Sequence, residues 1–255
     1  MRFVKRRDQK TKLLLLAMLF ASGLCIYWRY IFGGDLPVFN DSGNDTWQQY
    51  TMHYHTIVNH IRSGSFSWWD FTNGFGTNMF NLNLFDPSLI LLYLLGVITG
   101  PEHMGYYLVW IQIGRILLAG MAMYHLLGYY GLSEKAKLLA AYIYGLNGFL
   151  IVWGQHYQFG MITVYVPVLL FLLERSLQKR RITPLFPLMV CGTAIYSAYL
   201  AYMSLILVGC YLIVRLLMME SLRARTKIRL FFTSCGGILL GVGMSLMVLL
   251  PTAAV

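Results

Sequence analysis

Apolar segments of membrane-spanning length recur along this sequence, and they limit its fold more than any other feature. A helix that crosses the hydrocarbon core of a bilayer requires about 20 mostly apolar residues. Polar connections separate seven such segments, at 13–32, 105–130, 138–153, 160–174, 184–199, 201–219 and 230–250. We therefore predict an all-α integral membrane protein, a polytopic helical bundle with about seven transmembrane helices.

The charge content supports a membrane protein over a soluble or nucleic-acid-binding one. Charged residues make up 12% of the sequence, whereas an average soluble domain has roughly 25%. The net charge of +10 would suit nucleic acid, but the basic residues cluster between the apolar segments. We therefore expect membrane lipid as a partner and no nucleic acid.

The basic residues predict the orientation, because cytoplasmic connections carry an excess of Lys and Arg. The segment 84–99 decides the topology, since it begins at Asp86-Pro87 and holds only about a dozen apolar residues, as interfacial helices do. If it does not cross, the N-terminus is cytoplasmic and the C-terminal end is outside. Arg215 then lies near the cytoplasmic end of its span, and its side chain extends toward the cytoplasmic surface. The inner segments then hold 16 of the 20 Lys and Arg residues, at 1–12, 131–137, 175–183 and 220–229.

The first external loop is the most promising place for chemistry. The part from 33 to 83 has about 50 residues, and loops of that length are usually functional. Its stretch Thr46–Arg62 predicts a surface helix with one apolar face, formed by Tyr50, Tyr54, Ile57, Val58 and Ile61. We therefore interpret 1–255 as one transmembrane module, in which 33–104 is an external loop with two interfacial helices, 46–62 and 84–99.

Two carboxylates in the run NDSGND are the candidate catalytic residues. Asp41 and Asp45 lie just after the first span, where a carboxylate can accept a proton from an attacking hydroxyl or hold a divalent ion. Asp45 precedes Thr46 and could instead cap the helix, and Asp41 could be a solvated turn residue. Neither the i, i+2 offset of His53 and His55 nor the i, i+5 offset of His55 and His60 puts two histidines on one helical face, so we assign no metal ligands.

Two further polar residues could bind a donor phosphate. Arg115 lies about a third of the way into the segment 105–130, near its outer end, where an anionic phosphate is a suitable partner. An ion pair of Arg115 with Asp86 or Glu102 is the alternative. His156 stands in the outer connection WGQHYQ and could bind phosphate or shuttle a proton, or it could be an ordinary loop histidine.

The order of these segments resembles a known family. The external loop has NDSGNDTWQQY followed by GSFSWWDFTNGFGTN, then come DPSLILLYLLG, YYGLSEKAKLLAAYIYGLNGFL and WGQHYQFGMITVYVPVLLFLLERSLQKRR. Together they resemble the N-terminal portion of the YfhO family of bacterial membrane proteins, which are similar to GT-C glycosyltransferases. The resemblance covers essentially the whole chain and implies a location in the bacterial cell membrane.

The resemblance also implies a reaction. It predicts transfer of a sugar from a polyprenyl-phosphate donor to a cell-envelope polymer, such as a teichoic acid or lipoteichoic acid, on the extracytoplasmic face. An acidic residue of the first external loop is the base in that fold, and matching by position assigns this role to Asp45, with Asp41 as its neighbour. Arg115 and His156 would then stabilise the departing phosphate. The cofactor is unknown, with a divalent cation as one option.

A membrane transporter or lipid flippase without glycosyl transfer is the alternative function. Such proteins place polar or ionisable residues deep in several spans around a site near the midplane. The segments after 160 are nearly free of charge, and the polar residues gather at the outer mouth. This distribution favours an enzyme that acts on the outer face.

Overall fold

The computed structural model describes residues 2–37, 45–65, 67, 69–71, 75–78, 86–154 and 156–253, and the statements below concern these residues. The chain forms two compact units, Met1–Val164 and Tyr165–Val255. Each unit is described by itself. Asp41 lies outside the described residues.

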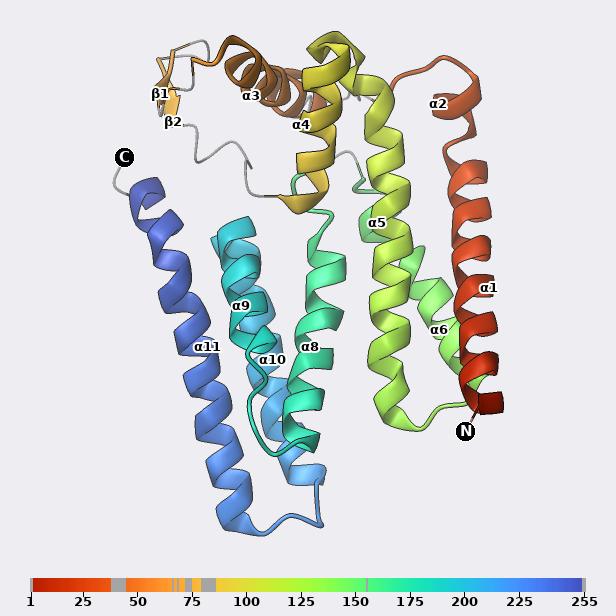
Figure 1. Cartoon of the computed structure of the whole chain (residues 1–255), viewed down its shortest axis with the longest axis vertical. Coiled ribbons are helices and arrows are strands. Elements are labelled where there is room, and N and C mark those ends of the chain that lie inside the picture. The colour runs from red at the N-terminus through yellow and green to blue at the C-terminus, as the bar shows by residue number, and fades with distance from the viewer. Residues whose placement is uncertain are drawn as a thin grey trace. The chain divides into compact units, whose positions relative to one another are not determined.

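Two long helices and one shorter helix pack together in the first unit. They are α1 (Arg2–Ile26), α5 (Met104–Leu127) and α6 (Glu134–Gly145), and α5 contacts both of the others (Figure 1). Leu19 of α1 fits between Gly120 and Gly145, where an added Cβ would collide with its side chain. Small residues let membrane helices approach closely, so the two glycines allow this packing.

A layer of helices from the predicted external loop, which we call the outer layer after that prediction, covers one end of α5. The π-helical turn η1 (Thr46–Tyr50) continues into α3 (Thr51–Ser63), which runs crosswise to α5 and packs on α4 (Pro87–Thr99) (Figure 1). The predicted apolar face is confirmed for Tyr50, Tyr54, Ile57 and Val58, which are buried, whereas Ile61 is 45% exposed. This face packs on buried residues of α4 and α5, which include Leu89, Leu92, Tyr93, Met104, Leu108 and Ile111.

The start of α4 follows from its first residues. Asp86 caps the helix, because its carboxylate accepts a hydrogen bond from the backbone N–H of Ser88 at 2.8 Å, and Pro87 occupies the first helical position. α4 has 13 residues, which corresponds to about 20 Å. Since a hydrocarbon core is about 30 Å thick, this length agrees with the prediction of a short apolar helix.

Short elements connect the helices of the first unit. They are α2 (Trp28–Phe32), the antiparallel strands β1 (Trp69–Asp70) and β2 (Thr77–Asn78), η3 (Pro101–His103), η4 (Gly128–Tyr130) and α7 (Gly148–Ile151). The predicted helix 138–153 is interrupted: α6 ends at Gly145, and Asn147 caps α7 by accepting a hydrogen bond from the backbone N–H of Leu150. Asparagine favours this capping geometry over a helix interior.

The second unit is a bundle of four helices, α8 (Ile162–Gln178, whose first residues belong to the first unit), α9 (Leu185–Tyr196), α10 (Ala198–Met218) and α11 (Ala224–Ala253). α9 and α11 pack most closely at Gly237 and Gly241 of α11. Its hydrophobic core contains Leu169, Leu173, Phe186, Val190, Val208 and Leu212.

One buried ion pair in this unit departs from the expected distribution of charge. Glu174 of α8 is fully buried and accepts hydrogen bonds from the Tyr211 hydroxyl and from Nε and Nη2 of Arg215. Arg215 therefore pairs within the bundle instead of directing its charge toward the headgroups as predicted. A carboxylate this deeply buried persists only with such partners.

Four helices of the described chain are long and apolar enough to cross a membrane: Asp8–Ile26, Pro101–Tyr130, Ala198–Met218 and Ala224–Pro251. The shorter apolar helices are Pro87–Thr99 and Leu185–Tyr196. The all-α membrane architecture is confirmed. The number of seven crossings and the single-module organisation stay predictions.

Candidate functional site

The structure brings Asp45 and His156 together at the outer layer of the first unit. Asp45 directly precedes η1, and His156 lies in the connection between α7 and α8. The carboxylate Oδ2 of Asp45 lies 3.7 Å from Nδ1 of His156. Their side chains are 34% and 14% exposed, respectively. A ligand can therefore reach the carboxylate, while the imidazole is more enclosed.

Tyr50 holds the same imidazole nitrogen. Its hydroxyl lies 2.8 Å from Nδ1 of His156 and accepts a hydrogen bond from Nε2 of Gln158 at 3.0 Å. Burial and the neighbouring Asp45 carboxylate raise the pKa of Tyr50 to about 12. The hydroxyl thus keeps its proton at neutral pH and can donate it to Nδ1. Nδ1 faces both this hydroxyl and the Asp45 carboxylate. When the hydroxyl donates to Nδ1, a neutral imidazole carries its proton on Nε2, and when Nδ1 carries the proton, it can donate to either oxygen.

Aromatic rings fix the plane of the imidazole. Trp153 stacks on His156 with ring centroids 5.1 Å apart and an interplanar angle of 27°, and Phe159 lies 6.0 Å away. The connection that carries these rings is anchored by Tyr157, whose buried hydroxyl donates to the carbonyl oxygen of Pro37 at 2.9 Å. The two chain segments that meet at the site are therefore tied together at a second point.

Asp45 does not cap the helix, so that alternative is wrong. Its backbone is already helical (φ −61°, ψ −38°), and its side chain accepts no capping hydrogen bond. Oδ1 instead accepts a hydrogen bond from Nε2 of Gln49 at 2.9 Å. The amide holds one oxygen of the carboxylate and leaves Oδ2 directed toward His156.

Arg115 forms the ion pair with Asp86 that was one of its two predicted roles. Its Nη2 donates to Oδ2 of Asp86 at 2.9 Å, and its Nε donates to the Ser88 hydroxyl at 2.9 Å. Both charged side chains are fully buried. Burial raises the pKa of the Asp86 carboxyl, while the guanidinium and the Ser88 hydrogen bonds oppose that rise. The predicted contact of Arg115 with a phosphate stays a prediction, and it requires this enclosed pair to open.

The Arg115 guanidinium also supports the chain near His156. A Cβ at Gly160 would lie 2.9 Å from Nη1 of Arg115, so only glycine fits there without a shift. Nη1 itself is buried without a hydrogen-bond partner in the described structure, as are the hydroxyls of Tyr54 and Tyr93. Arg115 therefore underlies the connection that carries His156 and retains one unused donor.

The histidines of α3 lie apart from this site. His60 Nε2 is 3.6 Å from Oδ1 of Asp70, and burial lowers the pKa of His53. Within the described residues, no group of three or more His, Cys, Asp or Glu side chains is placed to hold a metal ion.

Sequence reasoning missed two polar contributors. Tyr50 was assigned to the apolar face of the helix, and its hydroxyl proves to be the partner of His156. Ser88 was not considered, although its hydroxyl links Asp86 to Arg115. The role of Tyr50 could have been suspected from the polar run WGQHYQ, because its side chains need hydrogen-bond partners where other helices bury them.

Comparison with known proteins adds one finding. The sequence model of a family described as "Bacterial membrane protein YfhO" matches residues 13–254. No curated protein and no solved structure matches the chain.

Proposed function

Because the chain belongs to the YfhO family of bacterial membrane proteins, we propose that it is a membrane glycosyltransferase of the GT-C type. It transfers a sugar from a polyprenyl-phosphate donor to a cell-envelope acceptor on the extracytoplasmic face. The observation that carries this proposal is the meeting of Asp45 with His156, whose Nδ1 is also held by Tyr50. A partly exposed carboxylate beside an oriented imidazole provides a base and a hydrogen-bond donor at one place.

The proposed reaction is a single displacement at the anomeric carbon. The acceptor hydroxyl loses its proton to the Asp45 carboxylate as its oxygen bonds to that carbon. The bond between the carbon and the phosphate oxygen breaks, and the polyprenyl phosphate leaves with the electron pair. His156 donates a hydrogen bond from Nε2 to a phosphate oxygen and stabilises the developing charge. Asp41 is the neighbouring carboxylate and the second candidate for the base.

Arg115 has a positioning role in this proposal. Its pair with Asp86 is enclosed, and its guanidinium underlies Gly160 in the connection that carries His156. A direct contact with the donor phosphate would use the free Nη1 donor and would require the local layer to move. The acceptor is proposed to be a cell-wall polymer such as a teichoic acid, on the resemblance alone.

The test compares two carboxylates of the same loop. Membranes that contain the full chain are incubated with radiolabelled polyprenyl-phosphate sugars and cell-wall acceptor, and labelled polymer is measured. D45N should reduce transfer about 100-fold or more, because general base catalysis contributes at least that much. D35N is the matched control, since the exposed Asp35 pairs only with Arg29 among the described residues, and its activity should match that of the wild type.

Two outcomes would overturn the proposal. If D45N retains transfer, Asp45 is not the base. If the wild-type protein moves the lipid-linked sugar across vesicles and yields no labelled polymer, the chain is a transporter or flippase.

A further inference from the structure

A groove at one end of the second unit combines a cationic mouth with an apolar floor. It has a volume of about 490 Å³. The groove is lined by Arg180 and Arg181, from the turn after α8, and by Arg229 of α11, which we call the mouth. It is also lined by Gly236, Gly237 and Leu240 of α11, which we call the floor. The two ends therefore suit different parts of one amphipathic ligand.

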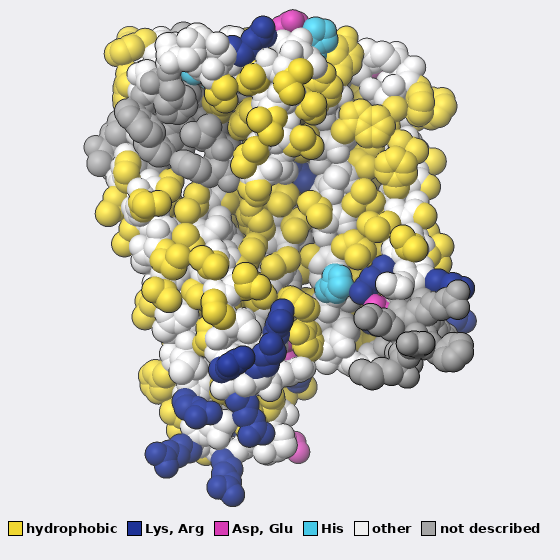
Figure 2. Space-filling view, viewed as in Figure 1, with side chains coloured by type: hydrophobic (Ala, Val, Ile, Leu, Met, Phe, Trp, Pro, Cys, Tyr) yellow, Lys and Arg dark blue, Asp and Glu magenta, His cyan; other side chains and the backbone are white. Residues whose placement is uncertain are grey.

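The arginines of the mouth are available for an anion. In the described structure none of the three forms an ion pair, and no acidic residue lines the groove. The sequence from 165 to 255 contains nine Lys and Arg residues but only two acidic ones, and Glu174 is already paired with Arg215. The Lys and Arg side chains gather at the end of this unit where α10 turns into α11 (Figure 2).

The backbone of the turn places its arginines in an unusual way. Arg180 has a left-handed conformation (φ 52°), which a glycine usually occupies after a helix end. The turn is closed by backbone hydrogen bonds from Arg180 to Leu177 and from Arg181 to Ser176, both 3.1 Å. An arginine therefore stands where the conformation disfavours a large side chain.

The floor of the groove is open and apolar. Gly237 and Gly241 allow α11 to approach α9, since a Cβ at Gly237 would already touch Phe186, whereas a Cβ at Gly236 would meet nothing within 4 Å. The distance along α11 from Arg229 to Leu240 is about 16 Å at 1.5 Å per residue. This length accommodates a large part of an acyl chain.

The predicted topology places this end of the bundle at the cytoplasmic surface, because the connections there are basic. Guanidinium groups bind phosphate through paired hydrogen bonds, and basic pockets between membrane helices bind anionic lipid headgroups. We propose that the groove binds one anionic glycerophospholipid of the cytoplasmic leaflet. Its phosphate lies among Arg180, Arg181 and Arg229, and one acyl chain lies along Gly236 and Leu240.

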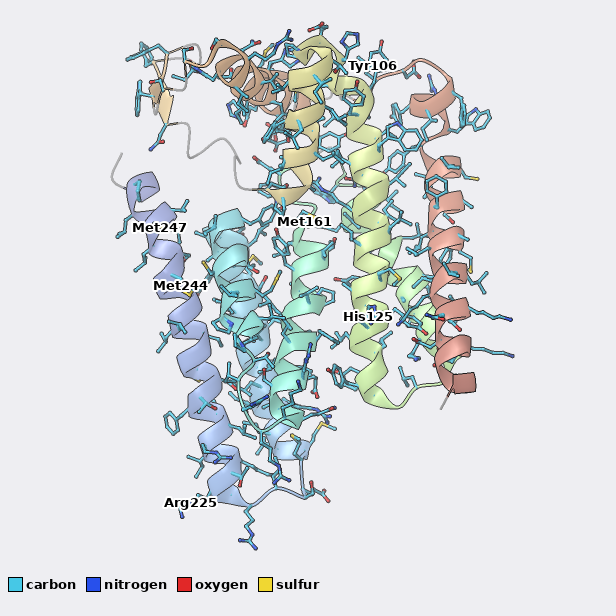
Figure 3. The ribbon with its side chains drawn as sticks, viewed as in Figure 1. Tyr106, His125, Met161, Arg225, Met244 and Met247 are labelled. Carbon is cyan, nitrogen blue, oxygen red and sulfur yellow. The ribbon has the colours of Figure 1, made fainter. Side chains whose placement is uncertain are left out.

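The first test removes charge inside and outside the groove. The full chain is purified in neutral detergent, and bound lipid is counted by native mass spectrometry after addition of phosphatidylglycerol or phosphatidylcholine with identical acyl chains. The wild type should retain one phosphatidylglycerol and no phosphatidylcholine. R181Q/R229Q should weaken this binding about 30-fold, since each of the two basic residues near a membrane surface contributes about 1 kcal/mol. R223Q/R225Q removes the same charge, and Arg225 points away from the helices (Figure 3), so its binding should be unchanged.

The second test fills the floor and leaves the arginines intact. G236L should abolish lipid retention, whereas G243L should not, because Gly243 is equally open but does not line the groove. Equal losses in R181Q/R229Q and R223Q/R225Q would overturn the proposal, since the attraction would then be a general surface effect. Competition by soluble glycerol phosphate as strong as that by phosphatidylglycerol, or full retention in G236L, would also overturn it.

Discussion

The hydroxyl of Tyr50 and Nδ1 of His156 lie 2.8 Å apart and join the first helical turn of the outer layer to the connection that follows α7. This contact fixes the imidazole beside Asp45. It also links two segments of the chain that sequence spacing does not relate. The candidate site thus depends on a tertiary contact and not on a linear motif.

Removal of the Tyr50 hydroxyl should affect both stability and transfer. Y50F loses the hydrogen bonds to His156 and Gln158, which should lower the free energy of unfolding by about 1 kcal/mol. Sugar transfer should fall about tenfold, because the imidazole is less well oriented. Y106F is the control, since Tyr106 is 52% exposed near the start of α5 (Figure 3). Equal effects of the two substitutions would show that Tyr50 does not orient His156.

The contribution of Tyr50 should also depend on pH. Its pKa is raised from 10 to about 12 in the folded protein, so the protonated hydroxyl favours the folded state. This contribution is fully present below pH 10 and is lost as the pH rises from about 10 toward about 12. The difference in melting temperature between wild type and Y50F should be constant from pH 7 to about 9 and shrink above about 10. A difference that grows with pH would contradict the assignment.

The outer layer should tolerate loss of the buried ion pair better than loss of one partner. R115M leaves the buried Asp86 carboxylate without its cation, which should cost about 3–5 kcal/mol of unfolding free energy. The double variant D86L/R115M removes both charges and should recover much of that stability. Thermal unfolding in detergent measures both. The single variant D86L is measured as well. If the loss of unfolding free energy in D86L/R115M equals the sum of the losses in D86L and R115M, the two residues are not coupled.

Gly160 should be required beside the guanidinium. G160A places a Cβ 2.9 Å from Nη1 of Arg115, and the strain should cost about 1–3 kcal/mol. G148A is the matched control, because a Cβ at Gly148 meets nothing within 4 Å. A melting temperature of G160A equal to that of G148A would show that the guanidinium moves aside freely.

The orientation in the membrane can be measured by cysteine labelling. In a background without the four native cysteines, S65C in the external loop should react with a membrane-impermeant maleimide in intact cells. S221C, in the turn before α11, should react only after lysis, because its flanking basic residues predict a cytoplasmic location. Labelling of S221C in intact cells would reverse the predicted topology.

The local sequence pattern predicted the helices of the outer layer correctly. The spacing of Tyr50, Tyr54, Ile57 and Val58 gave their common face, because side chains three and four apart lie together on a helix. Asp86-Pro87 predicted the start of α4, because both residues favour helix beginnings. These signals lie within a few residues of the elements that they specify.

The polar contacts between distant segments could not be predicted from the local sequence pattern. Asp45 looked equally like a cap and a base, and only the fold directs Oδ2 toward His156. The partner of Arg115 could be narrowed to Asp86 or Glu102, but the choice depends on how α4 packs against α5. The pair of Glu174 with Arg215 was not anticipated, since it joins α8 to α10 across the core of the second unit.

The most direct test asks whether Asp45 and His156 act as one unit in sugar transfer. Transfer from polyprenyl-phosphate sugar to acceptor is measured for D45N, H156Q and D45N/H156Q under identical conditions. Residues that serve the same step have strongly non-additive effects, so the double variant should be no slower than the slower single variant. If the two losses multiply, or if D45N transfers sugar at the wild-type rate, Asp45 and His156 do not form the catalytic site.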